Sequence, residues 1–186
     1  MKDVPYASAI GSIMYAMLCT RPNVCLAISL AGRYQSNPGV DHCTAVKNIL
    51  KYLKRTKDIF LVYGGDKELI VNGYVNASFD TDPNDSKSQT GYVFPLNGGA
   101  VSWCCSKQSV VAGSTCGAEY IASLEAANEG VWMKEFISDL GVIPSASGPM
   151  KIFCDNTGAI ALARESRFHK RTKHIKRRFN SIRDLA

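Results

Sequence analysis

Cysteine and histidine are the residue types that would build a disulfide framework or a zinc site. The seven cysteines are odd in number and irregularly spaced, which argues against a disulfide framework. No Cys-x-x-Cys pair occurs, and with three histidines in 186 residues the sequence does not predict a Cys/His zinc site. We therefore expect reduced, mostly buried thiols at Cys19, Cys25, Cys43, Cys104, Cys105, Cys116 and Cys154.

The strongest charge feature is a basic segment near the C-terminus. Residues 164–183 contain nine Lys or Arg, opposed within that span by Glu165 alone. Such a run is either a solvated helix face or a phosphate-contacting segment, and the sequence leaves both interpretations open. The overall net charge of +6 is compatible with a nucleic-acid partner. The residues predicted to contact nucleic acid are Lys170, Arg171, Lys173, Lys176, Arg177 and Arg178.

The N-terminal part of the chain is predicted to be helical. Residues 6–19 and 23–36 read as two helices separated by Arg21-Pro22, and apolar residues recur at helical spacing over residues 40–55. We assign residues 1–57 to this helical region. The apolar stretch 7–19 also has the length of a signal-peptide core, although it is too short for a membrane span of about 20 residues.

The remaining residues, 58–186, are predicted to form a mixed sheet with flanking helices. Short strands are expected at 59–63 and 69–75, and a second hairpin at 92–96 and 100–106 turns at Asn97-Gly98-Gly99. A long helix over 117–140, a strand over 150–154 and a short helix over 157–164 follow. Strands followed by alternating helix and strand predict an α/β fold.

Eight segments follow one another in a fixed order, at 6–15, 20–23, 45–53, 85–94, 100–103, 118–122, 154–156 with 159–161, and 171–175. Together they resemble one family, the copia-type retrotransposon polyproteins, at the end of the reverse transcriptase and in the ribonuclease H domain. The resemblance covers nearly the whole chain. It implies a ribonuclease H-like fold over 58–186, C-terminally truncated, preceded by the end of a reverse transcriptase over 1–57.

In that family acidic residues hold two magnesium ions that cleave the RNA of RNA–DNA hybrids. The resemblance assigns the first aspartate to the position of Asn76, the glutamate to Glu119 and the next aspartate to Asp155. A further aspartate would lie beyond Ala186. By residue type alone, Glu119 would be a solvent-facing charge and Asp155 a helix cap.

A carboxylate can bridge two cations, whereas the Asn76 amide offers one neutral oxygen. We therefore expect an impaired, remnant site at Glu119 and Asp155 with no cofactor, and weak binding of RNA–DNA hybrid or other nucleic acid. Retained magnesium-dependent activity is an alternative. Another is a secreted effector of a plant pathogen that acts on host proteins, since the sequence also resembles a protein of the RxLR type. The chain lacks an Arg-x-Leu-Arg motif near its N-terminus. A retroelement product would be intracellular, whereas an effector would be secreted and then enter the host cell.

Overall fold

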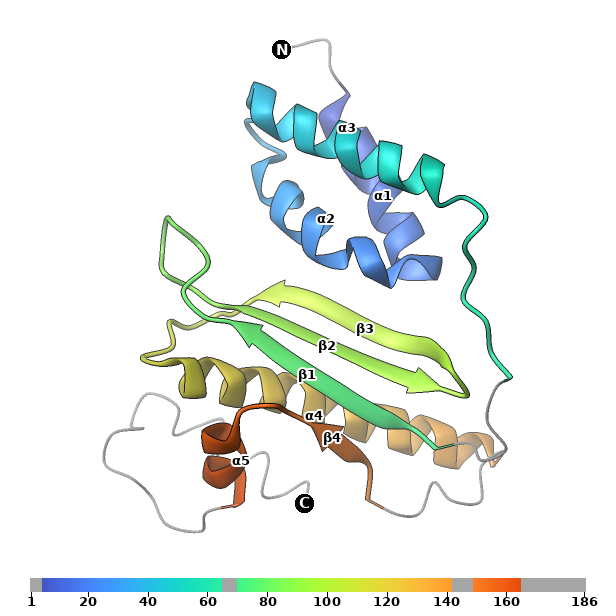
Figure 1. Cartoon of the computed structure of the whole chain (residues 1–186), viewed down its shortest axis with the longest axis vertical. Coiled ribbons are helices and arrows are strands. Elements are labelled where there is room, and N and C mark those ends of the chain that lie inside the picture. The colour runs from blue at the N-terminus through green and yellow to red at the C-terminus, as the bar shows by residue number, and fades with distance from the viewer. Residues whose placement is uncertain (1–4, 65–69, 142–148, 165–186) are drawn as a thin grey trace. The chain divides into compact units, whose positions relative to one another are not determined.

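The computed structural model describes residues 5–64, 70–141 and 149–164. Internal contacts divide the chain into two units. One comprises Met1–Val62 with Cys104–Ser106, and the other comprises Tyr63–Trp103 with Lys107–Ala186. The elements of both are labelled in Figure 1.

Three helices form the first unit: α1 (Tyr6–Thr20), α2 (Cys25–Ala31) and α3 (Val40–Arg55). Short 3-10 turns, η1 (Pro22–Val24) and η2 (Gly32–Tyr34), flank α2, and the first contains the proline predicted to break the helix. Ile10, Ile13 and Ile28 are almost completely buried between the helices. The Tyr6 hydroxyl donates to the carbonyl of Ala31 at 2.8 Å, so the N-terminal apolar stretch is part of a packed helix.

Helix α3 has the bounds that its apolar periodicity predicts. Its buried stripe consists of Cys43, Val46 and Ile49. At its start, the N–H of Gly39 donates to Nδ1 of His42 at 2.8 Å, so a side chain satisfies one of the amide groups at the helix end.

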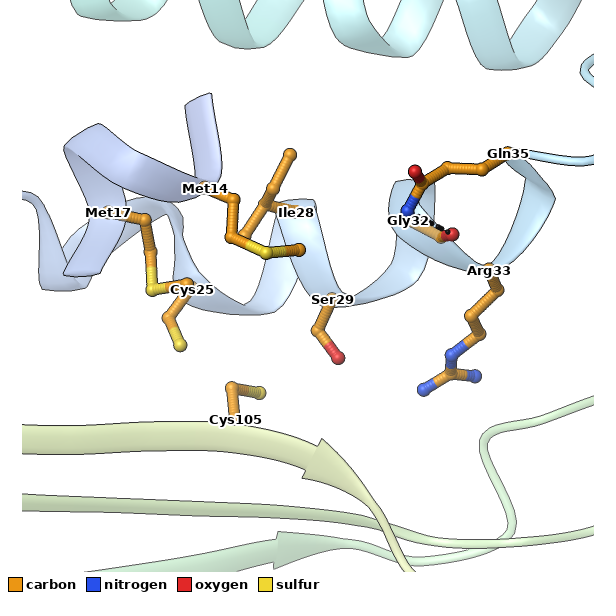
Figure 2. A pocket seen from close by; sticks show the side chains of 9 residues that line it. All are labelled: Met14, Met17, Cys25, Ile28, Ser29, Gly32, Arg33, Gln35 and Cys105. Carbon is orange, nitrogen blue, oxygen red and sulfur yellow. Dashed lines mark hydrogen bonds between the residues drawn. The ribbon is translucent and has the colours of Figure 1, made fainter. Parts of the chain in front are cut away.

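Thiols of the helical unit are less uniformly buried than the composition suggested. Cys25 and Cys43 are buried, whereas Cys19 is exposed. Figure 2 shows Cys25 beside Met17, with which it lines a pocket on this unit. Burial raises the pKa of the Cys25 thiol to about 11, so it stays protonated at neutral pH.

The second unit contains a four-stranded sheet in the order β3-β2-β1-β4. Its strands are β1 (Asn72–Ser78), β2 (Gln89–Leu96), β3 (Gly99–Lys107) and β4 (Lys151–Phe153). Strand β1 pairs antiparallel with β2 and parallel with β4, which makes the sheet mixed. The β2–β3 hairpin is confirmed, with Asn97 and Gly98 at positive φ in its turn. The prediction of a strand at 59–63 is wrong, because these residues form none.

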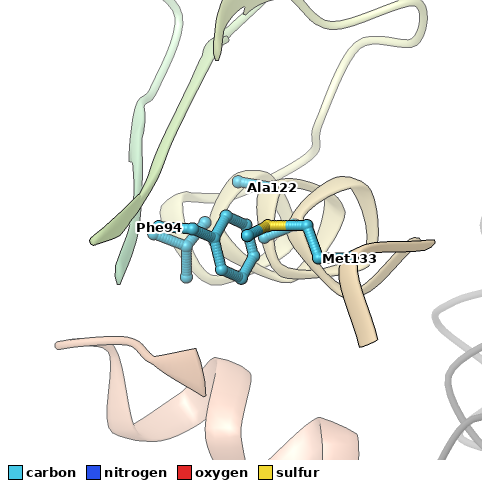
Figure 3. Packing of buried hydrophobic residues seen from close by; sticks show 5 residues of the cluster. Phe94, Ala122 and Met133 are labelled. Atoms are coloured by element: carbon cyan, nitrogen blue, oxygen red, sulfur yellow. The ribbon is translucent and has the colours of Figure 1, made fainter. Parts of the chain in front are cut away.

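Helix α4 (Thr115–Leu140) runs along one face of this sheet (Figure 1). Val75 and Phe94 from the sheet pack against Ala122, Ala126 and Met133 of the helix, and Figure 3 shows part of this cluster. The side chain of Phe94 requires a glycine at position 73, since a Cβ there would lie 2.6 Å from Phe94 Cε1. The short helix α5 (Thr157–Arg164) follows β4, and the α/β fold of mixed sheet and flanking helices is confirmed.

Polar contacts fix the loop between β1 and β2 and the start of α4. Lys107 at the end of β3 contacts the carboxylates of Asp82 at 2.6 Å and Asp85 at 2.8 Å. The Ser114 hydroxyl accepts the N–H of Gly117 at 3.1 Å and so caps α4. Buried Gln108 donates to the Thr90 hydroxyl at 3.1 Å and to the carbonyl of Ala118 at 2.9 Å. Together these bonds anchor the beginning of α4 to the sheet.

Candidate functional site

Glu119 is a buried carboxylate on the sheet-facing side of α4. It is 7% exposed, so the interpretation as a solvent-facing charge is wrong. Its Oε1 accepts the N–H of Ala77 at 3.0 Å. The pairing of β1 with β4 ends at Tyr74, and Glu119 thus satisfies a backbone amide of β1 beyond that point.

Asp155 lies in the connection from β4 to α5 and is exposed. The helix cap is the neighbouring Asn156, whose Oδ1 accepts the N–H of Ala159 at 2.9 Å. The prediction that Asp155 caps the helix is therefore wrong, because the next residue along the chain is the cap.

Glu119, Cys154 and Asp155 converge on one point. One ligand atom of each lies within 4.8 Å of the others. The thiol of Cys154 donates to Oε2 of Glu119 at 4.0 Å, the oxygen that Ala77 leaves free. Burial raises the pKa of Glu119, the hydrogen bond from Ala77 lowers it, and the nearby Asp155 raises it. Two carboxylates held this close favour a bound proton or cation between them.

A second thiol, that of Cys116, stands one helical turn before Glu119 on α4. Cys116 and Cys154 pack against the same buried cluster of Tyr120, Leu124 and Ala159. Burial raises the pKa of Cys116, and the nearby Cys154 raises it further. A Cβ at residue 158 would lie only 3.0 Å from the Cys116 sulfur, so Gly158 leaves room for the thiol at the start of α5.

The side chain of Asn76 is exposed, on the face of β1 opposite to that of the buried Val75. The strand alternates, with Gly73 and Val75 buried and Tyr74, Asn76 and Ser78 exposed. Asn76 directly precedes Ala77, whose amide contacts Glu119. Among the sequence-predicted site residues, the structure thus brings Glu119 and Asp155 together and places Asn76 on the adjoining strand.

The predicted nucleic-acid contacts, Lys170, Arg171, Lys173, Lys176, Arg177 and Arg178, lie outside the described residues. The two cysteines at the carboxylates were not predicted as site residues. Signals for both were present in the sequence, because Cys154 directly precedes Asp155 and Cys116 is three positions before Glu119 on the predicted helix.

The Pol polyproteins of plant retrotransposons are similar to this chain over almost all of its length. The chain is 44% identical over 186 residues to the retrovirus-related Pol polyprotein from transposon TNT 1-94 of Nicotiana tabacum, and 34% identical over 181 residues to that from transposon RE2 of Arabidopsis thaliana. It spans 14% and 12% of these two polyproteins. The chain belongs to this family of retrotransposon Pol polyproteins, and the copia-type resemblance is confirmed.

A shorter relative comes from a plant pathogen. The chain is 42% identical over 135 residues to the Secreted RxLR effector protein 161 of Plasmopara viticola, an alignment that covers 72% of this chain and 94% of that protein. No protein-family model matches the chain, and no solved structure does.

Within the described ranges, the helices are too short or too polar to cross a lipid bilayer.

Proposed function

We propose that this retroelement-derived protein keeps a ribonuclease H-like fold but cleaves RNA–DNA hybrids poorly or not at all. The observation that carries the proposal is the donor set around Glu119. The described residues supply two carboxylates there and a thiol, while the adjoining strand carries the neutral Asn76. Hard Mg²⁺ ions prefer charged oxygen ligands in near-octahedral geometry, and this set does not suit a pair of them.

The electrostatic deficit is large enough to matter for catalysis. A unit charge 4 Å from a cation at an effective dielectric constant near 20 contributes roughly 4 kcal/mol. Since about 1.4 kcal/mol corresponds to a tenfold change in rate, losing this charge beside divalent ions predicts a loss of about a thousandfold.

A single-turnover cleavage assay on a labelled RNA–DNA hybrid tests this proposal. We expect negligible magnesium-dependent cleavage by the chain and a gain in Asn76→Asp, because the substitution returns a negative charge to the position that the resemblance assigns to the first metal-binding aspartate. The matched control is Asn72→Asp, at the start of the same strand. Cleavage by the unmodified chain that disappears in Glu119→Gln would contradict the proposal.

Weak nucleic-acid binding is the activity that we propose the protein retains. Besides the basic segment 164–183, two exposed aromatic rings of the sheet support this. Tyr74 and Phe153 stack at 5.1 Å between ring centroids, and both are nearly half exposed. Exposed Lys151 lies two residues before Phe153 on β4. Stacked aromatic rings beside a cation are suited to unpaired bases next to a phosphate.

Fluorescence titrations with single-stranded RNA and with hybrid, at two salt concentrations, test this binding. Binding should weaken as salt rises, because phosphate contacts release counterions. Tyr74→Ala should weaken single-strand binding by about fivefold or more, in keeping with the usual contribution of base stacking. Tyr15→Ala, an exposed tyrosine of the helical unit, is the control. No binding at low salt would refute this part of the proposal.

A second candidate function is that of a secreted effector acting on host proteins. The similarity to the Plasmopara viticola protein over 94% of its length favours it. N-terminal sequencing of secreted material discriminates, since a secreted form should lack the apolar stretch before Cys19. That stretch makes up most of α1, in which Ile10 and Ile13 are almost completely buried, so its removal would disrupt the helical unit. Secreted material that still begins at Met1 would speak against signal-peptide processing.

A further inference from the structure

Two asparagines of this chain stand in the tripeptide Asn-x-Ser, in which x is not proline. One tripeptide joins Asn76 to Ser78 within β1, and the other joins Asn84 to Ser86 in the loop between β1 and β2. In a chain that enters the secretory pathway, this tripeptide is the acceptor for N-linked oligosaccharides and is characteristic of surface loops. The two tripeptides differ in local structure, and this difference indicates which of them is the better acceptor.

We propose that Asn84 is an N-glycosylation site and that Asn76 is a weaker acceptor in the same chain. This rests on the second candidate function, secretion, because oligosaccharide transfer takes place in the lumen of the secretory pathway. The oligosaccharide comes from a lipid pyrophosphate donor. The bond between its first sugar and the phosphate oxygen breaks, a carbon–nitrogen bond to Nδ2 of Asn84 forms, the nitrogen loses one proton, and the lipid pyrophosphate leaves.

The turn that carries Asn84 is held by the buried Asp82. Its Oδ1 accepts the N–H of Asn84 at 2.9 Å, and its backbone carbonyl accepts the N–H of Ser86 at 2.9 Å. Its Oδ2 contacts Nζ of Lys107 at 2.6 Å, which anchors the turn to the end of β3. These bonds engage the backbone of the tripeptide, whereas Asn84 and Ser86 are themselves exposed. The turn therefore presents both residues that define the acceptor at the surface, where an attached oligosaccharide displaces no core side chain.

The tripeptide of Asn76 is exposed as well, but it is part of a paired strand. Asn76 and Ser78 are both exposed on β1, and Asn76 lies opposite Gly91 in the antiparallel pairing with β2. A transferase that must enclose the tripeptide reaches it only before β1 pairs with β2. The loop that carries Asn84 has no such restriction, since loops remain at the surface of the folded chain. We therefore expect higher occupancy at Asn84 than at Asn76.

The test is cell-free translation of the full chain with microsomes of the endoplasmic reticulum. Two forms are compared, one with the chain's own N-terminus and one behind a foreign, cleavable signal peptide. Protection from added protease reports entry into the lumen, and a mobility shift that endoglycosidase reverses reports the oligosaccharide. The form with the foreign signal should be protected and glycosylated. If only this form is protected, the secretion hypothesis fails while the assignment of the acceptor stands.

Variants of the form with the foreign signal assign the acceptor. Asn84→Gln and Ser86→Ala should each remove the main glycosylated band, because each breaks the tripeptide, whereas Ser86→Thr should keep it. Asn76→Gln should remove only a minor band with two oligosaccharides. The matched control is Asn128→Gln, at an exposed asparagine of α4 outside any such tripeptide, and it should leave the pattern unchanged.

Mass spectrometry then measures the occupancy of each site. An amidase that releases the oligosaccharide converts the modified asparagine to aspartate, so the two peptides report on Asn84 and Asn76 separately. We expect the larger converted fraction at Asn84. A protected chain without oligosaccharide would overturn the proposal, and so would a main glycosylated band that survives in Asn84→Gln but is lost in Asn76→Gln.

Discussion

The two ends of α4 contact the rest of the unit through different kinds of side chain. Toward its C-terminal half, Ala126 and Met133 pack with Phe94 in an apolar core. Near its beginning, Cys116 and Glu119 meet the chain that follows β4 with thiols and carboxylates. The beginning of α4 is buried as well, because Cys116 and Cys154 pack against Tyr120, Leu124 and Ala159, but it also carries the polar Glu119. This contrast predicts a larger stability effect from truncating the buried Phe94 than from changing the half-buried Cys154.

The largest effect should come from Phe94→Ala. Phe94 is completely buried against α4, so its removal leaves a cavity and should lower the free energy of unfolding by about 3–5 kcal/mol. Urea denaturation measures this. Phe136→Ala, at a half-exposed position of the same helix, should cost less than about 1 kcal/mol. Equal costs for the two would mean that the core does not lie where the structure places it.

Gly73→Ala should have the next largest effect. The added methyl group would lie 2.6 Å from the ring of Phe94, and this overpacking should cost about 1–3 kcal/mol. At Gly91, on the paired strand, a Cβ would find its nearest neighbour at an ordinary 3.8 Å. Chemical denaturation of Gly73→Ala and Gly91→Ala therefore compares the two faces of the sheet. A more destabilising Gly91→Ala would contradict the assigned faces.

Lys107→Met should produce a destabilisation that depends on pH. The hydrogen bond from Lys107 lowers the pKa of Asp85 below its ordinary value of 3.8. A lowered carboxylate pKa contributes stability above pH 3.8, and this contribution is lost as the pH falls through the folded-state value. The stability difference between the unmodified chain and Lys107→Met should therefore shrink as the pH falls below 3.8. Denaturation curves over that range measure it, and a difference that grows on acidification would refute the assignment.

The smallest effect is expected at the polar end of α4. Cys154 is only half-buried, so Cys154→Ser in metal-free buffer should change the free energy of unfolding by less than about 1 kcal/mol. Thermal or urea unfolding of the variant checks this. A loss comparable to that of Phe94→Ala would show that the thiol is a core residue and not an available donor.

Local patterns in the sequence were sufficient for several elements. Regular apolar spacing predicted α3 over Val40–Arg55, and Asn97-Gly98 predicted the turn of the β2–β3 hairpin, because both depend on interactions between near neighbours. The strand expected at 59–63 failed for the opposite reason. β-prone residues form a strand only where a partner strand is available, and composition does not reveal the partner.

The candidate site shows the same limit. Motif resemblance pointed to Glu119 and Asp155, which do meet in space. Cys154 and Cys116 stand near Asp155 and Glu119 in the sequence, but the packing of the two cysteines against one cluster arises only when β4 pairs with β1 and its C-terminal end reaches α4. The burial of Glu119 likewise depends on the packing of α4 on the sheet, where its carboxylate accepts the N–H of Ala77, a contact between residues 42 positions apart.

We propose that this site lacks the charge to hold a pair of magnesium ions, and the number of Mg²⁺ ions bound per chain is a direct measure of this. Isothermal titration of the unmodified chain, in the presence of an uncleavable RNA–DNA hybrid, should show no saturable pair of Mg²⁺ sites, whereas Asn76→Asp should gain affinity. Two Mg²⁺ ions bound per unmodified chain and lost in Glu119→Gln would contradict the account.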